Sequence, residues 1–323
     1  MSDTDLTQGS QLSEPLADRR ILVMGMPRSG KTCIMQLIFE DKNPYDLMDQ
    51  LIPPTMVRTA YDMISGITVY DFPGIEDLAD VGGPDPEIFV GPNTSLVYVI
   101  DAQNEAGKSL AELLALIRVA LAANPALPVN VFIHKIDGLS EELKMETQQG
   151  IQQRVLKNMG FESLDSSNVQ FFLTTVFTET IREAMSRVSL RMVPRCDYLE
   201  SLLNSFCSKS SLDKVFLLDV RSKIYLATDS SPTDPQLYQF ACKTIDTIGD
   251  ISMLCAGLGP ERDDEVVMQR TVVTMDTNMR LFMYQVNLEL SLLCLGPSAV
   301  VKQQSLLEFN AAKVAKAIRQ ILQ

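Results

Sequence analysis

Short runs of apolar residues, separated by polar or glycine-rich segments, recur along the first part of the chain. Continuous runs of this kind are typical of strands that are buried on both faces of a parallel sheet. They predict strands at residues 20–25, 66–72, 94–102, 128–135 and 169–175. Helical periodicity between the runs predicts helices at 31–40, 110–123, 141–158 and 179–192. The alternation predicts an α/β domain over residues 19–194, with a doubly wound and mostly parallel sheet, after a disordered polar tail at 1–18.

A different order of elements begins after Pro194. The pattern predicts, in turn, a helix at 198–208, strands at 214–220 and 223–229, a helix at 235–255, strands at 266–276, 279–287 and 288–296, and a helix at 301–321. We therefore expect a separate α+β domain over residues 195–323. Its element order is that of longin and roadblock domains.

Composition and charge exclude several classes of function. The 323 residues include 28 basic and 41 acidic side chains, and the net charge of −13 argues against binding nucleic acid or anionic lipid through bulk charge. Six scattered cysteines without a CxxC pair, and a single histidine, argue against a disulfide framework or a zinc site. The most apolar stretch, residues 110–123, is broken by Glu112 and Arg118, so no direct membrane insertion is expected.

The first motif that carries chemistry lies between the first predicted strand and the first predicted helix. Residues 25–32 read GMPRSGKT and match G-x-x-x-x-G-K-[ST], the phosphate-binding loop. In this context, backbone N–H groups and the helix N-terminus hold phosphate oxygens, the lysine reaches the outer phosphates, and the threonine hydroxyl ligates magnesium. The predicted phosphate-binding residues are Gly25, Arg28, Ser29, Gly30, Lys31, Thr32 and Cys33.

A second motif, DFPG, ends the next predicted strand and matches the D-x-x-G of a GTPase second switch. Asp71 would orient a magnesium-bound water, and the Gly74 N–H would contact the γ-phosphate. The segment at 42–59 is interpreted as a loop that holds the first switch, with Thr55 as its magnesium ligand and Thr59 as the second choice. The predicted metal ligands are thus Thr32, Thr55 and Asp71.

Base recognition is predicted at the ends of two later strands. His134-Lys135-Ile136-Asp137 stands where GTPases carry N-K-x-D, and the Asp137 carboxylate can accept hydrogen bonds from guanine N1–H and N2–H₂, a pair that adenine lacks. The Lys135 stem would lie along the base, and a backbone N–H at Thr175 or Val176 would contact guanine O6. His134 replaces the usual asparagine. We interpret it as bracing the loop, since no nucleophile and orienting acid accompany it in the sequence.

These motifs together resemble those of a Rag-type small GTPase of the C/D class. The residues that carry the resemblance are GMPRSGKT, DFPG, HKID followed by GLSEELKMETQ, and SKIYLATDSSPTD, and the resemblance extends from about residue 20 to the end. HKxD in place of NKxD is a distinguishing mark of that class. The resemblance implies a switch that uses GTP or GDP with Mg²⁺, and a roadblock domain at 195–323 that forms a heterodimer with a Rag A/B-type subunit.

The same resemblance implies a cellular role. A scaffold complex would recruit the heterodimer to the vacuolar or lysosomal membrane, where it would transmit amino-acid availability to the target-of-rapamycin kinase complex. The expected location is the cytoplasm and the cytosolic face of that membrane, with the nucleus as a second location.

One position departs from the family pattern. Ile75 follows DFPG, where the family usually has a glutamine that orients the attacking water. An aliphatic side chain cannot hold a water by hydrogen bonding, so we expect slow hydrolysis of GTP. Two alternatives remain: a structural subunit that binds nucleotide statically, which Ile75 favours, and an ATP-using P-loop enzyme. Nucleotide extracted from the purified protein distinguishes the three.

Overall fold

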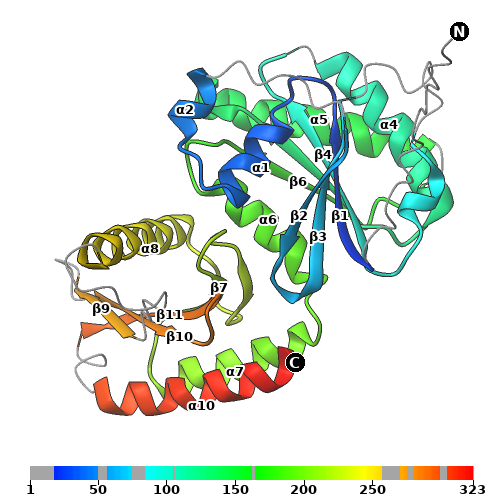
Figure 1. Ribbon diagram of the computed structural model, residues 1–323. Coiled ribbons are helices and arrows are strands. Elements are labelled where there is room, and N and C mark those ends of the chain that lie inside the picture. Colours follow the sequence, from blue (N-terminus) through cyan, green and yellow to red (C-terminus); the bar gives the residue numbers. More distant parts are fainter. Residues whose placement is uncertain are drawn as a thin grey trace, which may run out of the picture.

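The protein is described by a computed structural model, which covers residues 18–49, 57–74, 84–104, 106–161, 164–256, 270–274, 279–298 and 304–322. Two sheets form within these residues, one in each half of the chain (Figure 1). The predicted tail at 1–18 lies outside them except for Asp18, and so do Thr55 and Ile75. The predicted boundary between domains at 194 and 195 stays a prediction.

The first sheet has six strands in the order β2-β3-β1-β4-β5-β6. Five strands run parallel, as the apolar runs predict, and β2 pairs antiparallel with β3 at one edge. Their bounds are β1 (Arg19–Gly25), β2 (Thr59–Met63), β3 (Ile67–Asp71), β4 (Thr94–Asp101), β5 (Val129–His134) and β6 (Val169–Thr174). The doubly wound sheet predicted for the first part of the chain is therefore confirmed.

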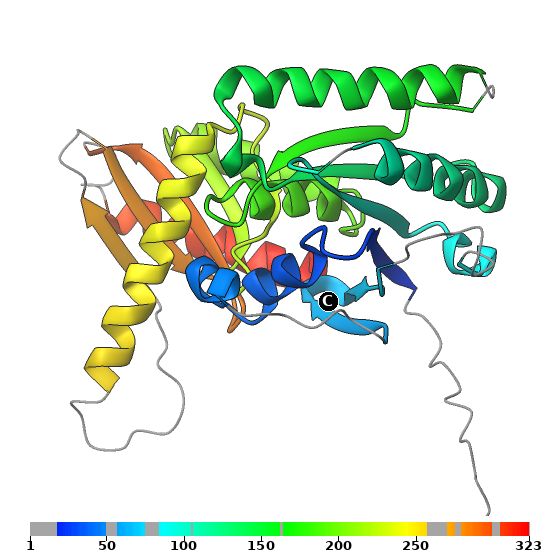
Figure 2. The ribbon, with the colours of Figure 1, turned by 90° about the horizontal axis from the view of Figure 1, so that it is seen from above.

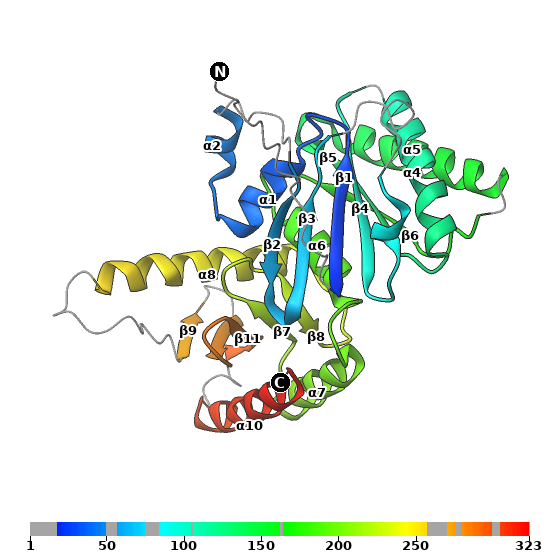
Figure 3. The ribbon, with the colours of Figure 1, turned by 45° about the vertical axis from the view of Figure 1, so that its right-hand side comes forward.

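Helices cover both faces of this sheet, because alternate strand residues point to opposite faces and both sets are apolar. The helices α1 (Lys31–Phe39) and α6 (Thr180–Leu190) pack on one face, and α4 (Ala106–Ala123) and α5 (Glu141–Phe161) pack on the other (Figure 3). Short 3₁₀ turns, η1 (Ile64–Gly66), η2 (Pro86–Phe89) and η3 (Ile136–Gly138), lie in the connections.

The prediction of a continuous loop at 42–59 was wrong at both of its ends. A short helix, α2 (Pro44–Asp49), forms where the Asn43 side chain accepts a hydrogen bond from Tyr45 N at 3.0 Å and Pro44 begins the first turn. Thr59 begins β2, which is mostly solvent-exposed and therefore lacks the apolar run that marks the other strands. Pairing with β3 stabilises β2, and a short polar sequence does not reveal such a pairing.

The second sheet is antiparallel throughout and has the order β8-β7-β11-β10-β9. Its strands are β7 (Lys214–Asp219), β8 (Tyr225–Thr228), β9 (Arg270–Thr274), β10 (Met279–Gln285) and β11 (Leu290–Pro297). The helices α7 (Cys196–Lys209) and α10 (Gln304–Leu322) pack on one face, and α8 (Pro235–Ala256) packs on the other. This is the predicted order of a roadblock or longin-type domain, although the strand expected at 266–276 is described only over 270–274.

An unbroken apolar core joins the two halves of the molecule. One cluster contains side chains from α1 and α6 of the first domain together with side chains from α7, α10 and the facing strands of the second. Seen from above, α4 lies at the opposite end of the molecule from α8 (Figure 2). Among the described helices, none combines the length and the apolar character needed to cross a bilayer.

Candidate nucleotide-binding site

The predicted motifs meet at one edge of the first sheet, because parallel strands end on the same side. Val23 near the end of β1 lies beside Asp71 at the end of β3. His134 at the end of β5 lies between Asp101 of β4 and Thr174 of β6. The carboxyl edge of a doubly wound sheet is where such folds bind ligands.

The phosphate-binding loop connects β1 to α1 and is closed around its own lysine. The Lys31 ammonium donates hydrogen bonds to the carbonyl oxygens of Gly25 and Met26, both at 2.9 Å. Burial lowers the pKa of Lys31 to about 8, an effect that the nearby Asp71 carboxylate partly opposes. An anionic ligand at the loop would favour the charged ammonium, so the electrostatics of the loop suit phosphate.

Close contacts within the site require glycine at two positions. Gly30 has a left-handed φ of 102°, and a Cβ there would lie 2.6 Å from the His134 ring. At Gly74, the last residue of DFPG, a Cβ would lie 2.6 Å from the Pro27 backbone. The phosphate-binding loop is thus packed directly against both the second-switch motif and the base-reading motif.

Thr32 and Asp71 form the polar centre of the site. The Thr32 hydroxyl donates to Asp71 Oδ2 at 3.1 Å. Burial raises the pKa of Asp71, whereas the Thr32 hydrogen bond and the Lys31 charge lower it. Within the described chain, Asp71 Oδ1 and Ser29 Oγ are buried without a hydrogen-bond partner, and no side chain caps the N-terminus of α1. These unsatisfied groups fit a phosphate with a magnesium ion that Thr32 and Asp71 would hold; the ion would neutralise phosphate charge.

His134 is buried between β6 and the phosphate-binding loop, and it cannot act as a charged group at neutral pH. Its Nδ1 lies 3.0 Å from the Thr174 hydroxyl, and the opposite side of the ring faces Gly30. Burial, reinforced by the positive charge of Lys135, lowers the pKa of His134 to about 4. A neutral ring wedged between β6 and the phosphate-binding loop is consistent with the bracing role that the sequence suggested.

Lys135 joins the base-reading motif to the phosphate-binding loop. Its ammonium donates to the Arg28 carbonyl oxygen at 2.7 Å and forms an ion pair with Asp101 at 2.6 Å. The Lys135 backbone is left-handed, with a φ of 63°, and its carbonyl accepts a hydrogen bond from the Gln103 amide at 2.9 Å. The Lys135 ammonium therefore fixes the base-reading motif against the phosphate-binding loop.

Asp137 is oriented by the loop that follows β6. The Thr175 hydroxyl donates to Asp137 Oδ1 at 2.6 Å, and the Thr175 N–H donates to the Thr180 hydroxyl at 3.1 Å. A carboxylate oxygen can accept more than one hydrogen bond, so both oxygens of Asp137 retain acceptor capacity for a ligand.

The structure brings most of the predicted site residues together. Those that meet at the carboxyl edge of the sheet, in its connecting loops or at the adjoining ends of β1, β3, β5 and α1, are Gly25, Arg28, Ser29, Gly30, Lys31, Thr32, Asp71, Gly74, His134, Lys135, Asp137 and Thr175. The half-buried side chains of Cys33 and Val176 pack against the apolar core, so only their backbones could serve a ligand. Thr59 stands opposite Asp71 in the β2–β3 ladder, and Thr55 lies outside the described residues.

Three residues of the site were missed by the sequence analysis: Asp101, Gln103 and Thr180. Asp101 is the final residue of a predicted strand, and its position at the carboxyl edge was the available signal. No local pattern marks Gln103 or Thr180, because each forms its hydrogen bond with a backbone group beyond its own turn. Gln103 donates to the Lys135 carbonyl oxygen, and Thr180 accepts from the Thr175 N–H.

Comparison with known proteins places this geometry in a family. Residues 20–249 match the model of the Gtr1/RagA G protein conserved region. The chain is 36% identical over 310 residues to the GTP-binding protein gtr2 of Schizosaccharomyces pombe, covering 94% of this chain and 98% of that protein. It is 34% identical to the human Ras-related GTP-binding protein C, covering 98% of this chain and 78% of that protein.

The chain belongs to the Gtr/Rag family of G proteins. Within this family the chain is less similar to gtr1 than to gtr2: its identity to the S. pombe GTP-binding protein gtr1 is 23%, covering 67% of this chain and 70% of that protein. The resemblance to the C/D class, inferred from HKID and the neighbouring motifs, is thereby confirmed.

The buried state of His134 gives a prediction about pH. Its pKa of about 4 lies below the ordinary value of 6.5, so the unfolded chain binds a proton that the folded chain excludes. The resulting loss of stability begins as pH falls below 6.5. Between pH 7.5 and 5.5, wild type should lose about 1 kcal/mol more unfolding free energy than His134→Asn, measured by urea titration.

Because the chain has one histidine, its NMR signal needs no assignment. The imidazole Cε1–H shift of the native protein should stay constant from pH 8 to pH 5.5. A midpoint near pH 6.5 would show that the ring is solvated.

Proposed function

We propose that the protein is a guanine-nucleotide-dependent switch that binds GTP or GDP with Mg²⁺ and hydrolyses GTP slowly. The observation that carries the proposal is the hydrogen bond from Lys135 to the Arg28 carbonyl oxygen, which fixes the base-reading motif against the phosphate-binding loop. One ligand that has both a guanine base and a phosphate chain satisfies both motifs. Loss of the γ-phosphate would release contacts at Thr32, Asp71 and Gly74, which gives a two-state output.

We further propose that the protein works as one subunit of a heterodimer with a Gtr1 or Rag A/B-type protein. Membership of the Gtr/Rag family supports this pairing. So does the second sheet, where β9 is an edge strand with no neighbour on its outer side among the described residues. An uncovered edge favours pairing with a strand of another chain.

The cellular role rests on family membership alone. The heterodimer would be held at the cytosolic face of the vacuolar or lysosomal membrane by a scaffold complex, with further protein in the cytoplasm and the nucleus. There it would signal amino-acid availability to the target-of-rapamycin kinase complex. A static, non-hydrolysing subunit is the second candidate, and Ile75 in place of glutamine favours it.

Guanine specificity is tested by Asp137→Asn. The substitution replaces one acceptor by an amide that cannot accept from both guanine donors, so affinity for GTP and GDP should fall about tenfold or more, equivalent to about 1–3 kcal/mol. Affinity for xanthine nucleotides should rise. Equilibrium binding with fluorescent nucleotides measures both, and nucleotide extracted from the purified wild type should be guanine.

A matched control is Asp165→Asn, which removes one exposed carboxylate at the opposite edge of the sheet, before β6 begins. It should leave both affinities unchanged. Equal GTP affinity in Asp137→Asn and wild type, or adenine nucleotide in the extract, would contradict guanine recognition.

The heterodimer prediction is tested by hydrogen exchange on the intact chain with a Gtr1-type subunit. Backbone amides of β9 should exchange at least about tenfold more slowly in the complex, because a partner strand would cover this edge. The opposite edge, β8, packs against α6 and is an internal control whose exchange should not change. Unchanged exchange at β9 in a confirmed complex would place the interface elsewhere.

Slow turnover is predicted from Ile75. Without a glutamine to orient water, intrinsic hydrolysis should be no faster than about 10⁻⁴ s⁻¹, the unaided rate of a small GTPase that has one. Ile75→Gln should raise the rate, most clearly with an activating protein, whereas Ile75→Met should not. Single-turnover GTP hydrolysis by the heterodimers measures this. A fast wild type, or no gain with glutamine, would show that another residue positions the water.

A further inference from the structure

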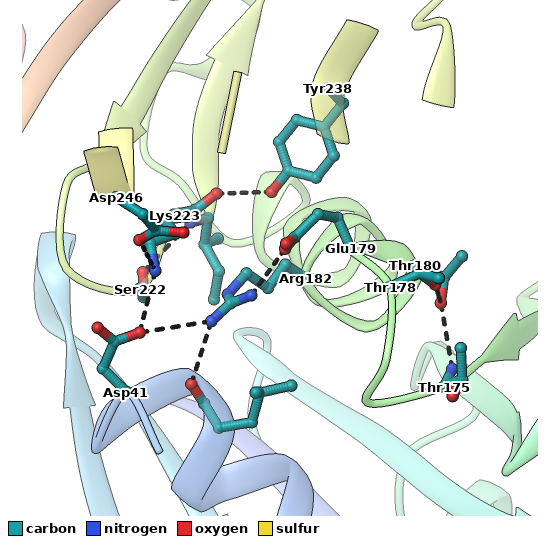
Figure 4. Close-up of polar contacts among 12 residues, drawn as sticks. Asp41, Thr175, Thr178, Glu179, Thr180, Arg182, Ser222, Lys223, Tyr238 and Asp246 are labelled. Carbon is teal, nitrogen blue, oxygen red and sulfur yellow. Dashed lines mark hydrogen bonds and ion pairs between the residues drawn. The ribbon is translucent and has the colours of Figure 1, made fainter. Parts of the chain in front are cut away.

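Five charged residues form a cluster where the two domains meet: Asp41, Glu179, Arg182, Lys223 and Asp246 (Figure 4). We call this set the Arg182 cluster. None of its members belongs to the nucleotide site described above. The cluster nevertheless touches both helices that begin at that site, α1 and α6.

Arg182 links the base-recognition loop to the end of α1. It is buried, and its Nη1 donates to Glu179 at 2.7 Å. Its Nη2 donates to the Leu37 carbonyl oxygen at 3.3 Å, and lies 3.6 Å from Asp41 Oδ1. Glu179 is the N-cap residue of α6 and directly precedes Thr180, which accepts the hydrogen bond from the Thr175 N–H.

Lys223 extends the cluster into the second domain. It lies in the turn between β7 and β8, and its side chain is only 4% exposed. Its ammonium donates to Asp41 at 2.9 Å and pairs with Asp246 of α8 at 2.5 Å, while its carbonyl oxygen accepts from the Tyr238 hydroxyl at 2.6 Å. One carboxylate oxygen of Asp41 therefore lies between a cation of each domain.

The geometry limits how freely these groups can move. Asp41 and Lys223 both have left-handed backbones, with φ values of 50° and 61°, an uncommon conformation for residues other than glycine that persists only where the surrounding structure fixes it. Arg182 presents a rigid planar fork with fixed donor directions. A shift of the second domain at Lys223 would therefore be transmitted to the end of α1 and to the start of α6.

We propose that Arg182 is a positioning residue for the guanine site, and that the second domain, acting through Lys223 and Asp41, strengthens nucleotide binding. The inference rests on the proposed function. The α1 end that Arg182 holds belongs to the helix that begins with Lys31 and Thr32. Another partner of Arg182, Glu179, directly precedes Thr180, which accepts from the Thr175 N–H of the loop that orients Asp137. Two sites joined in this way affect each other reciprocally in free energy.

The test is the release of mant-GDP from the full chain after Asp41→Asn. Asparagine is well tolerated in a left-handed conformation, and Asp41 is 65% exposed, so the fold should be retained. Release should be about two- to thirtyfold faster than from wild type, the range of coupling measured between linked sites. Glu40→Gln is the matched control: it removes the neighbouring charge, which forms an ion pair with Lys42 at 2.9 Å and is not a member of the Arg182 cluster, and this variant should release mant-GDP at the wild-type rate.

Lys223→Met tests whether the effect originates in the second domain. It should also accelerate release, and the double variant with Asp41→Asn should add little to either single change, since each substitution already removes the Asp41–Lys223 ion pair. The difference in mant-GDP release rate between wild type and Asp41→Asn should become smaller in 1 M salt, because salt screens a partly exposed ion pair. A general loss of folding would not have this salt dependence.

If Lys223→Met releases mant-GDP at the wild-type rate, the coupling to the second domain is overturned, whatever the rate of Asp41→Asn. Wild-type release from both variants would overturn the positioning role as well. Both results leave the proposed function intact, whereas a wild-type chain that does not bind mant-GDP at all would overturn the proposed function and the coupling together.

Discussion

The site depends on a constraint of parallel sheets: every strand ends on the same side. Because β1, β3, β5 and β6 are parallel neighbours or near neighbours, loops that are far apart in sequence must meet at one edge. Thr32 reaches Asp71 across 39 positions of sequence, and Thr175 reaches Asp137 across 38. No other element has to bring these residues together, and the helices on both faces serve mainly to bury the strands that carry them.

The helix α6 gives this sheet its connection to the second domain. Its apolar side chains belong to the core cluster that continues into α7, α10 and the second sheet. The buried Ser186 hydroxyl in that contact is satisfied: it donates to the Arg182 carbonyl oxygen at 2.7 Å and accepts from the Tyr225 N–H at 3.1 Å. Burying a polar group is tolerated when it is hydrogen-bonded in this way. A helix that starts at the base-recognition loop thus forms part of the domain contact along its length.

Sequence alone predicts the elements and residues whose signals are local. Lys31 and Asp71 belong to contiguous motifs, and the buried strands around them are continuous apolar runs, so both the sheet and its phosphate site could be predicted. The helix α2 and the strand β2 could not, since their sequence is short, polar and largely exposed. The pairing of Asp41 with Lys223 spans 182 positions and crosses two domains. It depends on how two finished folds pack, which no local pattern encodes.

The two site lysines show how the loops can keep their shape and still accept a ligand. An ammonium group has three donors. Lys31 uses two on the carbonyl oxygens of Gly25 and Met26, and Lys135 uses two on the Arg28 carbonyl oxygen and Asp101. The third donor of each lysine then remains for a ligand, so binding need not break the contacts that hold the loops. Preorganisation of this kind reduces the ordering that binding requires, so more of the interaction energy becomes affinity.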